Sequence, residues 1–191
     1  RTWFTLSLFN KSMMTIERVK VWLNQVQEIM AGRMLQTNFY DQIVEFVKEE
    51  GIFGTAAMFI EEDDEDIFMC RTLTAGQYAV DVDAKGRVNC FARRLSYTAQ
   101  QLENDFGFDA LPAEIQQELS QPDSNTHYEV RHLIQPNTKY SGSSPGTSGM
   151  KYQSLWWIAG KSTPDFLRES GYHEFPVIVG RWKVIGDDLY G

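Results

Sequence analysis

The sequence predicts an α+β fold in which two N-terminal helices precede a mostly antiparallel or mixed β-sheet with short inserted helices. Within residues 1–53, apolar side chains recur every three or four positions, as on one face of a helix. From residue 54 the apolar period changes to two, which is typical of strands. No regular alternation of strand and helix follows. We therefore expect 1–191 to be a single domain with a helical part, 1–53, and a β-rich part, 54–191.

The first predicted helix follows Thr15. Its apolar positions are separated by alternating steps of three and four, and they are Ile16, Val19, Leu23, Val26 and Met30, with Trp22 and Ile29 widening the stripe. Such a stripe can face a partner helix, as in a coiled coil, or the core of its own domain. We expect the core, because packing of one amphipathic face stabilises most helices of globular domains.

The second predicted helix begins after Thr37, whose hydroxyl is suited to an N-cap. Its apolar positions are Phe39, Ile43, Phe46 and Val47. Gly51 is the expected C-terminal stop, because glycine readily adopts the left-handed conformation that ends many helices. The first quarter of the chain is thus predicted to be a pair of helices joined by a short turn.

Two hairpins are predicted next. Residues 55–60 and 67–73 are apolar, strand-like runs around an unbroken acidic stretch. Residues 77–82 and 87–95 form the second pair, and Asp83 and Gly86 between them are placed as in a type I turn that closes into a bulge. The acidic stretch is expected to be a solvated hairpin tip, although it could also bind a divalent cation weakly, and it consists of Glu61, Glu62, Asp63, Asp64, Glu65 and Asp66.

The remaining chain alternates between short helices and strands. Residues 98–106 and 112–119 have helical patterns, and 127–135 alternates like a strand. Residues 136–150 are rich in Gly, Ser, Thr and Pro, so we expect a flexible loop there. Further strands are predicted at 155–159, 166–168 and 176–184. Trp156 and Trp157 would then lie on opposite faces of one strand, one in the core and one available as an interface anchor.

Composition restricts the class of protein. The 191 residues carry 18 basic and 26 acidic side chains, a net charge of −8, whereas a free-standing DNA-binding domain usually has a basic excess. Without the acidic stretch the acidic count falls to 20 and the net charge to −2. Cys70 and Cys90 are too few for a disulfide scaffold and are expected to be reduced core thiols. No apolar run is long enough to span a membrane. Because the chain starts at Arg1 without a signal pattern, we expect a piece of a longer protein.

Three short motifs for chemistry are incomplete. Residues 142–146 spell G-x-S-x-G, but the nucleophile is followed by Pro145, which has no N–H for an oxyanion hole. Residues 160–162 match the end of a P-loop, yet its first glycine would fall at Leu155. Residues 81–86 begin like a calcium-binding EF-hand loop that lacks its final acidic ligand. None of the three predicts an active site.

Histidine spacing offers no metal site. His127 and His132 are five residues apart in a predicted strand, so they face opposite sides. His132 shares a face with apolar residues, and we expect it to be a hydrogen-bonded core histidine. We therefore predict a structural or binding module with no catalytic residues, no cofactor and no metal. A soluble α+β enzyme or small-ligand-binding module is the alternative, and only the aromatic content supports it.

The C-terminal stretch resembles the podovirus-type bacteriophage head-to-tail connecting (portal) protein family, whose pattern there is "GY-x-E-F-P … R-W … YG". Shorter matches occur in the same order through nearly the whole chain. The chain lacks the stem and clip regions of that family, so the resemblance is to a wing-region fragment. The matching residues are Trp3, Phe4, Asn38, Phe39, Tyr40, Phe53, Gly54, His132, Phe175, Pro176, Arg181, Trp182, Tyr190 and Gly191.

The resemblance implies a mechanical function. Portal subunits form a ring, a dodecamer, at one capsid vertex, and double-stranded DNA passes through it during packaging and ejection without sequence-specific binding. The implied partners are further copies of the chain, the capsid, terminase and tail adaptor proteins, with no membrane. The implied location is the virion, and the host cytoplasm during assembly. ATP hydrolysis belongs to terminase, so the resemblance implies no enzyme here.

Two features leave alternatives open at this point. Arg181 beside Trp182 can bridge to a neighbouring subunit or anchor the last strand to its own core, and we favour the anchor. Phe175 and Pro176 are expected to serve packing and the start of a strand. In a ring, the acidic stretch would repeat as a band, and our hypothesis is that this band repels DNA phosphates or keeps the outer surface soluble.

Overall fold

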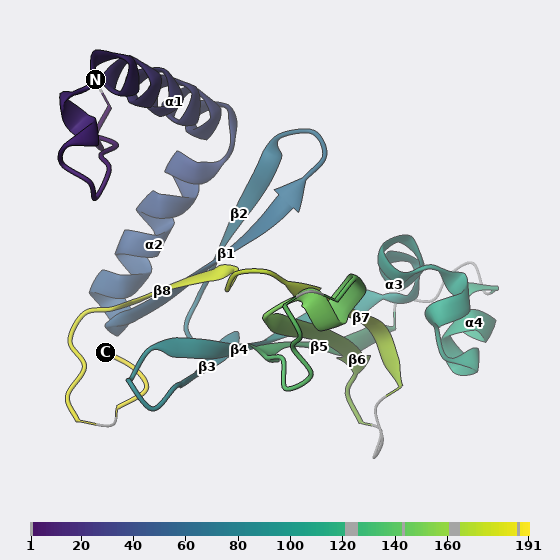
Figure 1. Ribbon diagram of the computed structural model, residues 1–191. Coiled ribbons are helices and arrows are strands. Elements are labelled where there is room, and N and C mark those ends of the chain that lie inside the picture. Colours follow the sequence, from purple (N-terminus) through teal and green to yellow (C-terminus); the bar gives the residue numbers. More distant parts are fainter. Residues whose placement is uncertain (1, 121–125, 143, 161–164, 187) are drawn as a thin grey trace.

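A computed structural model of the chain describes residues 2–120, 126–142, 144–160, 165–186 and 188–191 (Figure 1). The fold is α+β, as the sequence predicts. The helices are α1 (Glu17–Gln36), α2 (Phe39–Phe53), α3 (Ala99–Phe106) and α4 (Ala113–Leu119), with short 3-10 turns at Met13–Thr15, Phe108–Ala110 and Gly146–Gly149.

The strands form two antiparallel sheets, whereas the sequence predicts one mostly antiparallel or mixed sheet. A three-stranded sheet has the order β2-β1-β8, and a five-stranded sheet has the order β3-β4-β5-β6-β7. The strands are β1 (Thr55–Asp63), β2 (Ile67–Leu73), β3 (Tyr78–Val82), β4 (Val88–Thr98), β5 (His127–Pro136), β6 (Tyr152–Ile158), β7 (Phe166–Tyr172) and β8 (Val177–Arg181).

The two sheets pack face to face, and α2 covers the outer face of the smaller one. Alternation along β1 sends Ala57 and Phe59 to the five-stranded sheet, where they pack with Phe91 and Ile134. The opposite face of β1, including Met58, packs on α2. Both faces of β1 are therefore buried over residues 55–59, which explains the continuous apolar run at 56–60.

Helices α3 and α4 close the far end of the five-stranded sheet (Figure 1). Leu102 and Ile115, both fully buried, pack there with Val130 and Trp156. Helix α3 begins with a capping box, because the Thr98 hydroxyl accepts from the Gln101 N–H while the Gln101 side chain accepts from the Thr98 N–H. Both short helices lie within one or two residues of their predicted positions.

Helix α1 departs from the prediction that its apolar stripe faces the core. Leu23 is its one buried residue among those that the structure describes. Trp22 is 57% exposed and Ile29 is 63% exposed. The helix lies away from both sheets and contacts the preceding 3-10 turn and α2 (Figure 1). Periodicity reveals an apolar face but not what covers it, which is why the core prediction was wrong.

The boundaries of α2 also differ from the prediction. The helix continues through Gly51 and ends at Phe53, because Gly54 is the residue with a left-handed backbone (φ 73°). Its N-cap is Asn38 rather than Thr37. The Asn38 amide instead pairs with the backbone of Cys70 on β2, donating to its carbonyl (2.8 Å) and accepting from its N–H (2.9 Å). That pair fixes the start of α2 to the edge of the smaller sheet.

The remaining turns follow their sequence signals. The β3–β4 hairpin has the predicted type of turn, with the Gly86 N–H donating to the Asp83 carbonyl and Gly86 at φ 72°. The predicted loop 136–150 is held by its own hydrogen bonds in the described part, since the Asn137 amide donates to the carbonyls of Thr147 and Met150. The P-loop-like residues 161 and 162 lie outside the described residues.

Two strand boundaries near the C terminus differ from those expected. Strand β7 continues to Tyr172, beyond the predicted end at residue 168, and β8 ends at Arg181 rather than at 184. Strand β8 ends where its pairing with β1 ends, at Thr55 opposite Arg181. No helix within the described ranges has the length and apolarity that crossing a membrane requires.

Candidate functional site

The family-motif residues near the C terminus converge on the start of β1. The Trp182 N–H donates to the Gly54 carbonyl (2.8 Å), and the Gly191 N–H donates to the Thr55 hydroxyl (2.6 Å). The Tyr190 hydroxyl accepts from the Val80 N–H on β3 (3.4 Å). We call these residues, together with Arg181, the C-terminal anchor, because they bind the end of the chain to both sheets.

Arg181 makes its polar contact within the chain. Its guanidinium donates to the Gly86 carbonyl at the β3–β4 turn (2.6 Å), which joins β8 of the smaller sheet to a hairpin of the larger one. The neighbouring Trp182 side chain remains 76% exposed. Phe175 packs against Tyr152, and the Pro176 carbonyl accepts from the Ile60 N–H (2.9 Å). Strand β8 thus enters the smaller sheet along β1.

Gly54 is one of two positions in the C-terminal anchor, with Gly191, that leave no room for a side chain. It combines φ 73° with a Cβ direction that points into the carbonyl group of Gly191. We expect Gly54→Ala to lower the free energy of unfolding by clearly more than the roughly 1 kcal/mol of left-handed strain alone. Gly86→Ala is the matched control, since Gly86 has φ 72° and open space around its Cβ position. If urea denaturation shows equal losses of unfolding free energy for Gly54→Ala and Gly86→Ala, the contact between Gly54 and Gly191 contributes nothing to stability.

The N-terminal motif residues gather at the corner between α1 and α2. The Trp3 indole N–H donates to the Tyr40 hydroxyl (3.0 Å), and Phe4 packs edge-on against Trp3. Phe39 packs edge-on against Tyr40. These contacts tie the segment before α1 to the start of α2.

The two adjacent tryptophans of β6 lie on opposite faces, as the strand predicts. Trp156 is 8% exposed and stacks on His132, with ring centroids 3.7 Å apart. Trp157 is half-buried on the outer face of the five-stranded sheet, where Phe166 contacts it edge-on. Trp156 is therefore the tryptophan in the core, and Trp157 is the one that faces outward.

A buried polar row crosses the interface between the two sheets. Strand register places Arg93 of β4 opposite His132 of β5, and His132 opposite Trp156 of β6. Apolar pairs flank the row on both sides, because Phe91 lies opposite Ile134 and Leu95 lies opposite Val130. The alternation of β4 therefore sends an arginine to the inner face, between two apolar clusters.

We call Arg93, His132, Ser154 and Glu61 the Arg93 network. The Arg93 guanidinium donates to the Glu61 carboxylate (3.1 Å) and, through Nε, to His132 Nδ1 (3.1 Å). Its carbon Cζ lies 4.2 Å from the centroid of the Phe59 ring. The Arg93 side chain is 2% exposed, so Glu61 is a counterion to an almost fully buried cation. The network joins β1 to three strands of the other sheet.

Hydrogen bonding determines the tautomer of His132. Arg93 can only donate, so Nδ1 of His132 must accept, and the proton of a neutral ring resides on Nε2. That N–H then donates to the Ser154 hydroxyl (2.9 Å). Burial, with the charges of Arg93 and Arg168, lowers the pKa of His132 to about 2. The ring is therefore a donor to Ser154 and cannot take a proton from that hydroxyl.

The lowered pKa of His132 predicts a loss of stability in mild acid. In the unfolded chain His132 binds a proton near pH 6.5, whereas in the folded chain it does so only near pH 2. Acid therefore favours unfolding between these two pH values. We expect the free energy of unfolding to fall by about 2 kcal/mol from pH 7 to pH 5 through His132 alone. Urea denaturation of the chain and of His132→Gln at both pH values measures this difference. Equal pH dependence in the two would contradict it.

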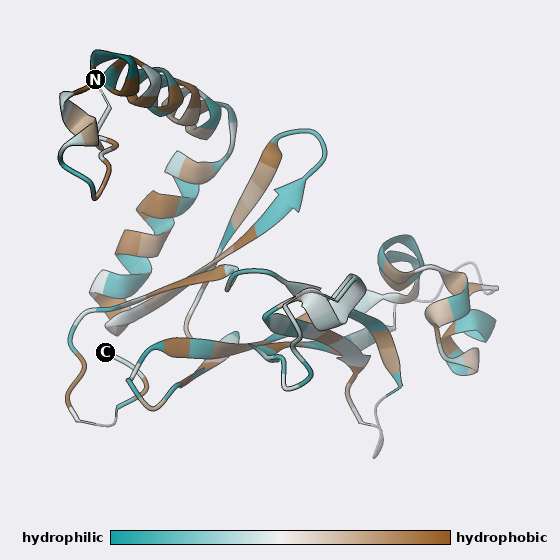
Figure 2. Cartoon of the chain, viewed as in Figure 1, coloured by the Kyte–Doolittle hydropathy of each residue, from teal (hydrophilic) through white to brown (hydrophobic). Residues whose placement is uncertain are grey.

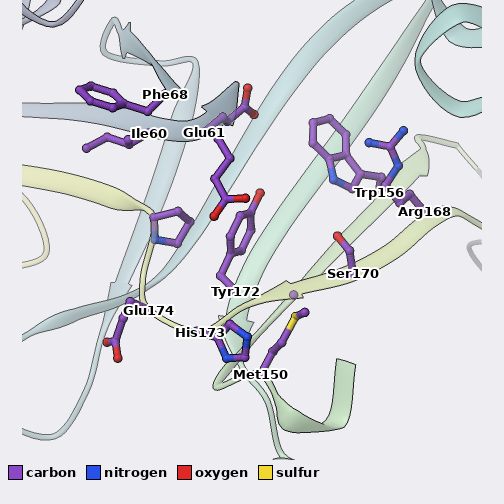
Figure 3. A pocket seen from close by; sticks show the side chains of 13 residues that line it. Ile60, Glu61, Phe68, Met150, Trp156, Arg168, Ser170, Tyr172, His173 and Glu174 are labelled. Carbon is purple, nitrogen blue, oxygen red and sulfur yellow. The ribbon is translucent and has the colours of Figure 1, made fainter. Parts of the chain in front are cut away.

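An open cavity lies beside the Arg93 network (Figure 3). Its volume is about 910 Å³, and its walls come from β1, the start of β2, β7 and the segment leading to β8. Figure 3 shows the Glu61 carboxylate pointing toward the Tyr172 hydroxyl. Burial and Glu61 raise the pKa of Tyr172, so the phenol stays protonated. One nitrogen of Arg93, Nη1, is buried without a hydrogen-bond partner among the described residues.

The acidic hairpin tip, residues 61–66, is divided by the structure. Glu61 belongs to the Arg93 network, and the Asp63 carboxylate accepts from the N–H groups of Glu65 and Asp66 to close the turn. Glu62, Asp64, Glu65 and Asp66 have exposed side chains. Within the described part of the chain, no group of three or more His, Cys, Asp or Glu side chains is arranged to hold a metal ion.

Sequence reasoning missed Arg93 and Ser154. Arg93 sits in the same two-residue alternation as Phe91 and Leu95, so its inward position could have been read from the pattern. Its counterion could not be predicted from the sequence, because Glu61 is 32 residues away and is one of six consecutive acidic residues. His132 was expected as a hydrogen-bonded core histidine, and the structure places it fully buried with two partners.

Comparisons with known proteins identify the family. The sequence profile described as "Bacteriophage head to tail connecting protein" matches residues 1–191. The chain is 32% identical over 190 residues to the portal protein of Salmonella phage epsilon15 and 30% identical over 191 residues to the probable portal protein of Bordetella phage BPP-1. Both alignments cover all of this chain and 34% of the relative, so the chain spans about a third of their length.

The profile match is consistent with the geometry described above. The residues that carried the sequence resemblance at the two ends of the chain are those of the C-terminal anchor and of the corner between α1 and α2. They hold the ends of the described fold in place, whereas the Arg93 network lies between the sheets. The chain belongs to the bacteriophage head to tail connecting protein family.

Proposed function

We propose that the protein containing this chain is a portal subunit, and that this chain is part of its wing region. The observation that carries the proposal is the match of all 191 residues to the connector family, with a portal protein and a probable portal protein at 30% identity or more. In this proposal twelve copies form a ring at one capsid vertex. Double-stranded DNA passes through the ring during packaging and ejection.

The proposed partners follow from that location. The ring would contact the capsid, terminase during packaging and tail adaptor proteins afterwards, first in the host cytoplasm and then in the virion. A net charge of −8 favours DNA that slides past the ring over DNA that adheres to it, because phosphate binding depends on cationic side chains. The proposal therefore includes no sequence-specific contact with DNA and no membrane.

The proposal assigns no catalysis and no cofactor to this chain. Ser154 and His132 have the residue types of a nucleophile and its general base. The hydrogen bond between them has the opposite direction, however, because His132 donates to the Ser154 hydroxyl. Both side chains are fully buried, so substrate has no access to them. ATP hydrolysis would remain with terminase, and the ring would serve as its docking platform.

Loss of the full-length protein from its phage tests the proposal. We expect infected cells to accumulate capsids without packaged DNA and without tails, and a plasmid copy of the gene to restore filled, tailed particles. Electron microscopy of lysates and nuclease-protected DNA measure the two outcomes. Filled and tailed particles formed in the absence of the protein would overturn the proposal.

A further inference from the structure

Helix α1 presents an apolar face with an arginine at each end. Arg18, Trp22, Ile29 and Arg33 follow one another at steps of four, seven and four, which places them along one side of the helix. Trp22 and Ile29 are among the most exposed apolar residues of the helix, and both arginines are exposed. Figure 2 shows hydrophobic positions recurring along α1. We call these four residues the arginine-flanked face.

The arginines of this face have no acidic partner within the described residues. Arg33 donates to Gln36 (2.9 Å), and the ion pairs of the described chain involve other cations. The described residues 2–36 carry four cations, Lys11, Arg18, Lys20 and Arg33, and two acids, Glu17 and Glu28. The segment is therefore basic in a chain whose total charge is −8.

The acidic hairpin tip is the complementary surface. Glu62, Asp64, Glu65 and Asp66 are exposed there, and Ile67 at the end of the turn is 50% exposed, so the tip also combines charge with an apolar side chain. The tip and the arginine-flanked face lie on different elements, β1–β2 and α1 (Figure 1). A closed ring requires two such different, mutually complementary patches on each subunit.

We propose that the arginine-flanked face of one copy binds the acidic hairpin tip of the next copy in the ring. This inference rests on the proposed function, because it assumes that copies assemble side to side. Trp22 and Ile29 contact Ile67 of the neighbouring copy, and Arg18 and Arg33 pair with the surrounding carboxylates. Such a contact buries the apolar surface of Trp22 and Ile29, which the single chain exposes to water. It also gives Arg18 and Arg33 acidic partners.

Charge reversal in the full-length protein tests the pairing. The first variant is Arg18→Glu with Arg33→Glu, and the second is Asp64→Arg with Glu65→Arg, which leaves Glu61 and Asp63 in their structural roles. We expect each to raise the protein concentration needed for ring assembly on the order of tenfold or more. The variant that combines all four substitutions restores the opposite charges and should assemble at close to the original concentration.

Lys85→Glu with Lys139→Glu is the matched control, since it makes the same change in net charge as the first variant at exposed residues elsewhere. Native mass spectrometry and negative-stain images measure the fraction of closed rings, and circular dichroism checks that every variant is folded. Rings formed equally well by all variants would overturn this inference and leave the portal proposal standing.

Two other results would also overturn the inference. A combined variant no better than the single reversals would mean that another surface occupies the arginine-flanked face, such as the remaining part of the subunit, a packaging protein or DNA. A reversal at Arg18 and Arg33 that unfolds the full-length protein, as seen by circular dichroism, would place the occupant within the same subunit. Absence of rings from the unsubstituted protein would instead reject the proposed function, and this inference with it.

Discussion

Replacing Glu61 with Gln is expected to lower the free energy of unfolding by about 3 kcal/mol, because it leaves the buried Arg93 cation without its counterion. The Arg93 side chain is 2% exposed, whereas Glu61 is 31% exposed. Partial access of water to Glu61 places the effect at the lower end of the range for breaking a buried ion pair. Urea denaturation of the chain measures the change.

Glu62→Gln is the matched control for this prediction. It removes the same charge one residue along β1, from a side chain that points the other way and is exposed. We expect it to change the free energy of unfolding by less than about 0.5 kcal/mol, as surface substitutions usually do. Similar losses for Glu61 and Glu62 would mean that the Arg93 network is not an energetic feature of the fold.

Phe59→Ala is expected to have an effect of similar or greater size, about 3–5 kcal/mol. Phe59 is fully buried between the sheets, where it stacks with Phe91 at 6.2 Å and meets His132 edge-on at 5.7 Å. Its ring also lies beneath the Arg93 guanidinium, at 4.2 Å from Cζ, so the substitution removes a cation–π contact as well as core volume.

Phe9→Ala provides the contrast for this second prediction. Phe9 is fully exposed in the segment before α1, so its removal should leave the free energy of unfolding of the chain unchanged within about 0.5 kcal/mol. A loss below about 1.5 kcal/mol for Phe59→Ala, well under the usual cost of emptying a core site, would show that the two sheets do not share the core described above. The measurement is again urea denaturation, with the slope compared to confirm two-state unfolding.

The fold could be predicted where short-range rules decide the structure. The change of period at residue 54 locates the boundary between helices and strands, and the spacing of Asp83 and Gly86 predicts the β3–β4 turn. Two nearby glycines, Gly51 and Gly54, compete for the end of α2, and local sequence cannot rank them. Pairing with β8 begins immediately after Gly54, so tertiary structure selects it.

Contacts between distant residues could not be predicted. Asn38 has the residue type of an N-cap, but its amide pairs with the backbone of Cys70, 32 residues away. Which of the six consecutive acids becomes the counterion of Arg93 depends on where β1 crosses the Arg93 row. The stripe of α1 has a periodicity that fits a core-facing helix, and only the structure shows Trp22 and Ile29 in water.

The acidic stretch thus divides into carboxylates with partners in the fold and exposed carboxylates. Glu61 forms an ion pair with Arg93 between the sheets, and Glu62, Asp64, Glu65 and Asp66 are exposed. Replacing only the four exposed acids with Ser tests the second group apart from the first. The inferred contact with α1 predicts impaired ring assembly, whereas a band that repels DNA predicts intact rings with altered packaging.

The mass of the full-length assembly tests most directly whether this chain is part of a subunit that assembles into a ring. Native mass spectrometry with negative-stain images should show closed rings of about twelve copies, as the family resemblance implies. A full-length protein that stays monomeric, or forms only open or irregular aggregates, at concentrations where it is folded would contradict ring assembly.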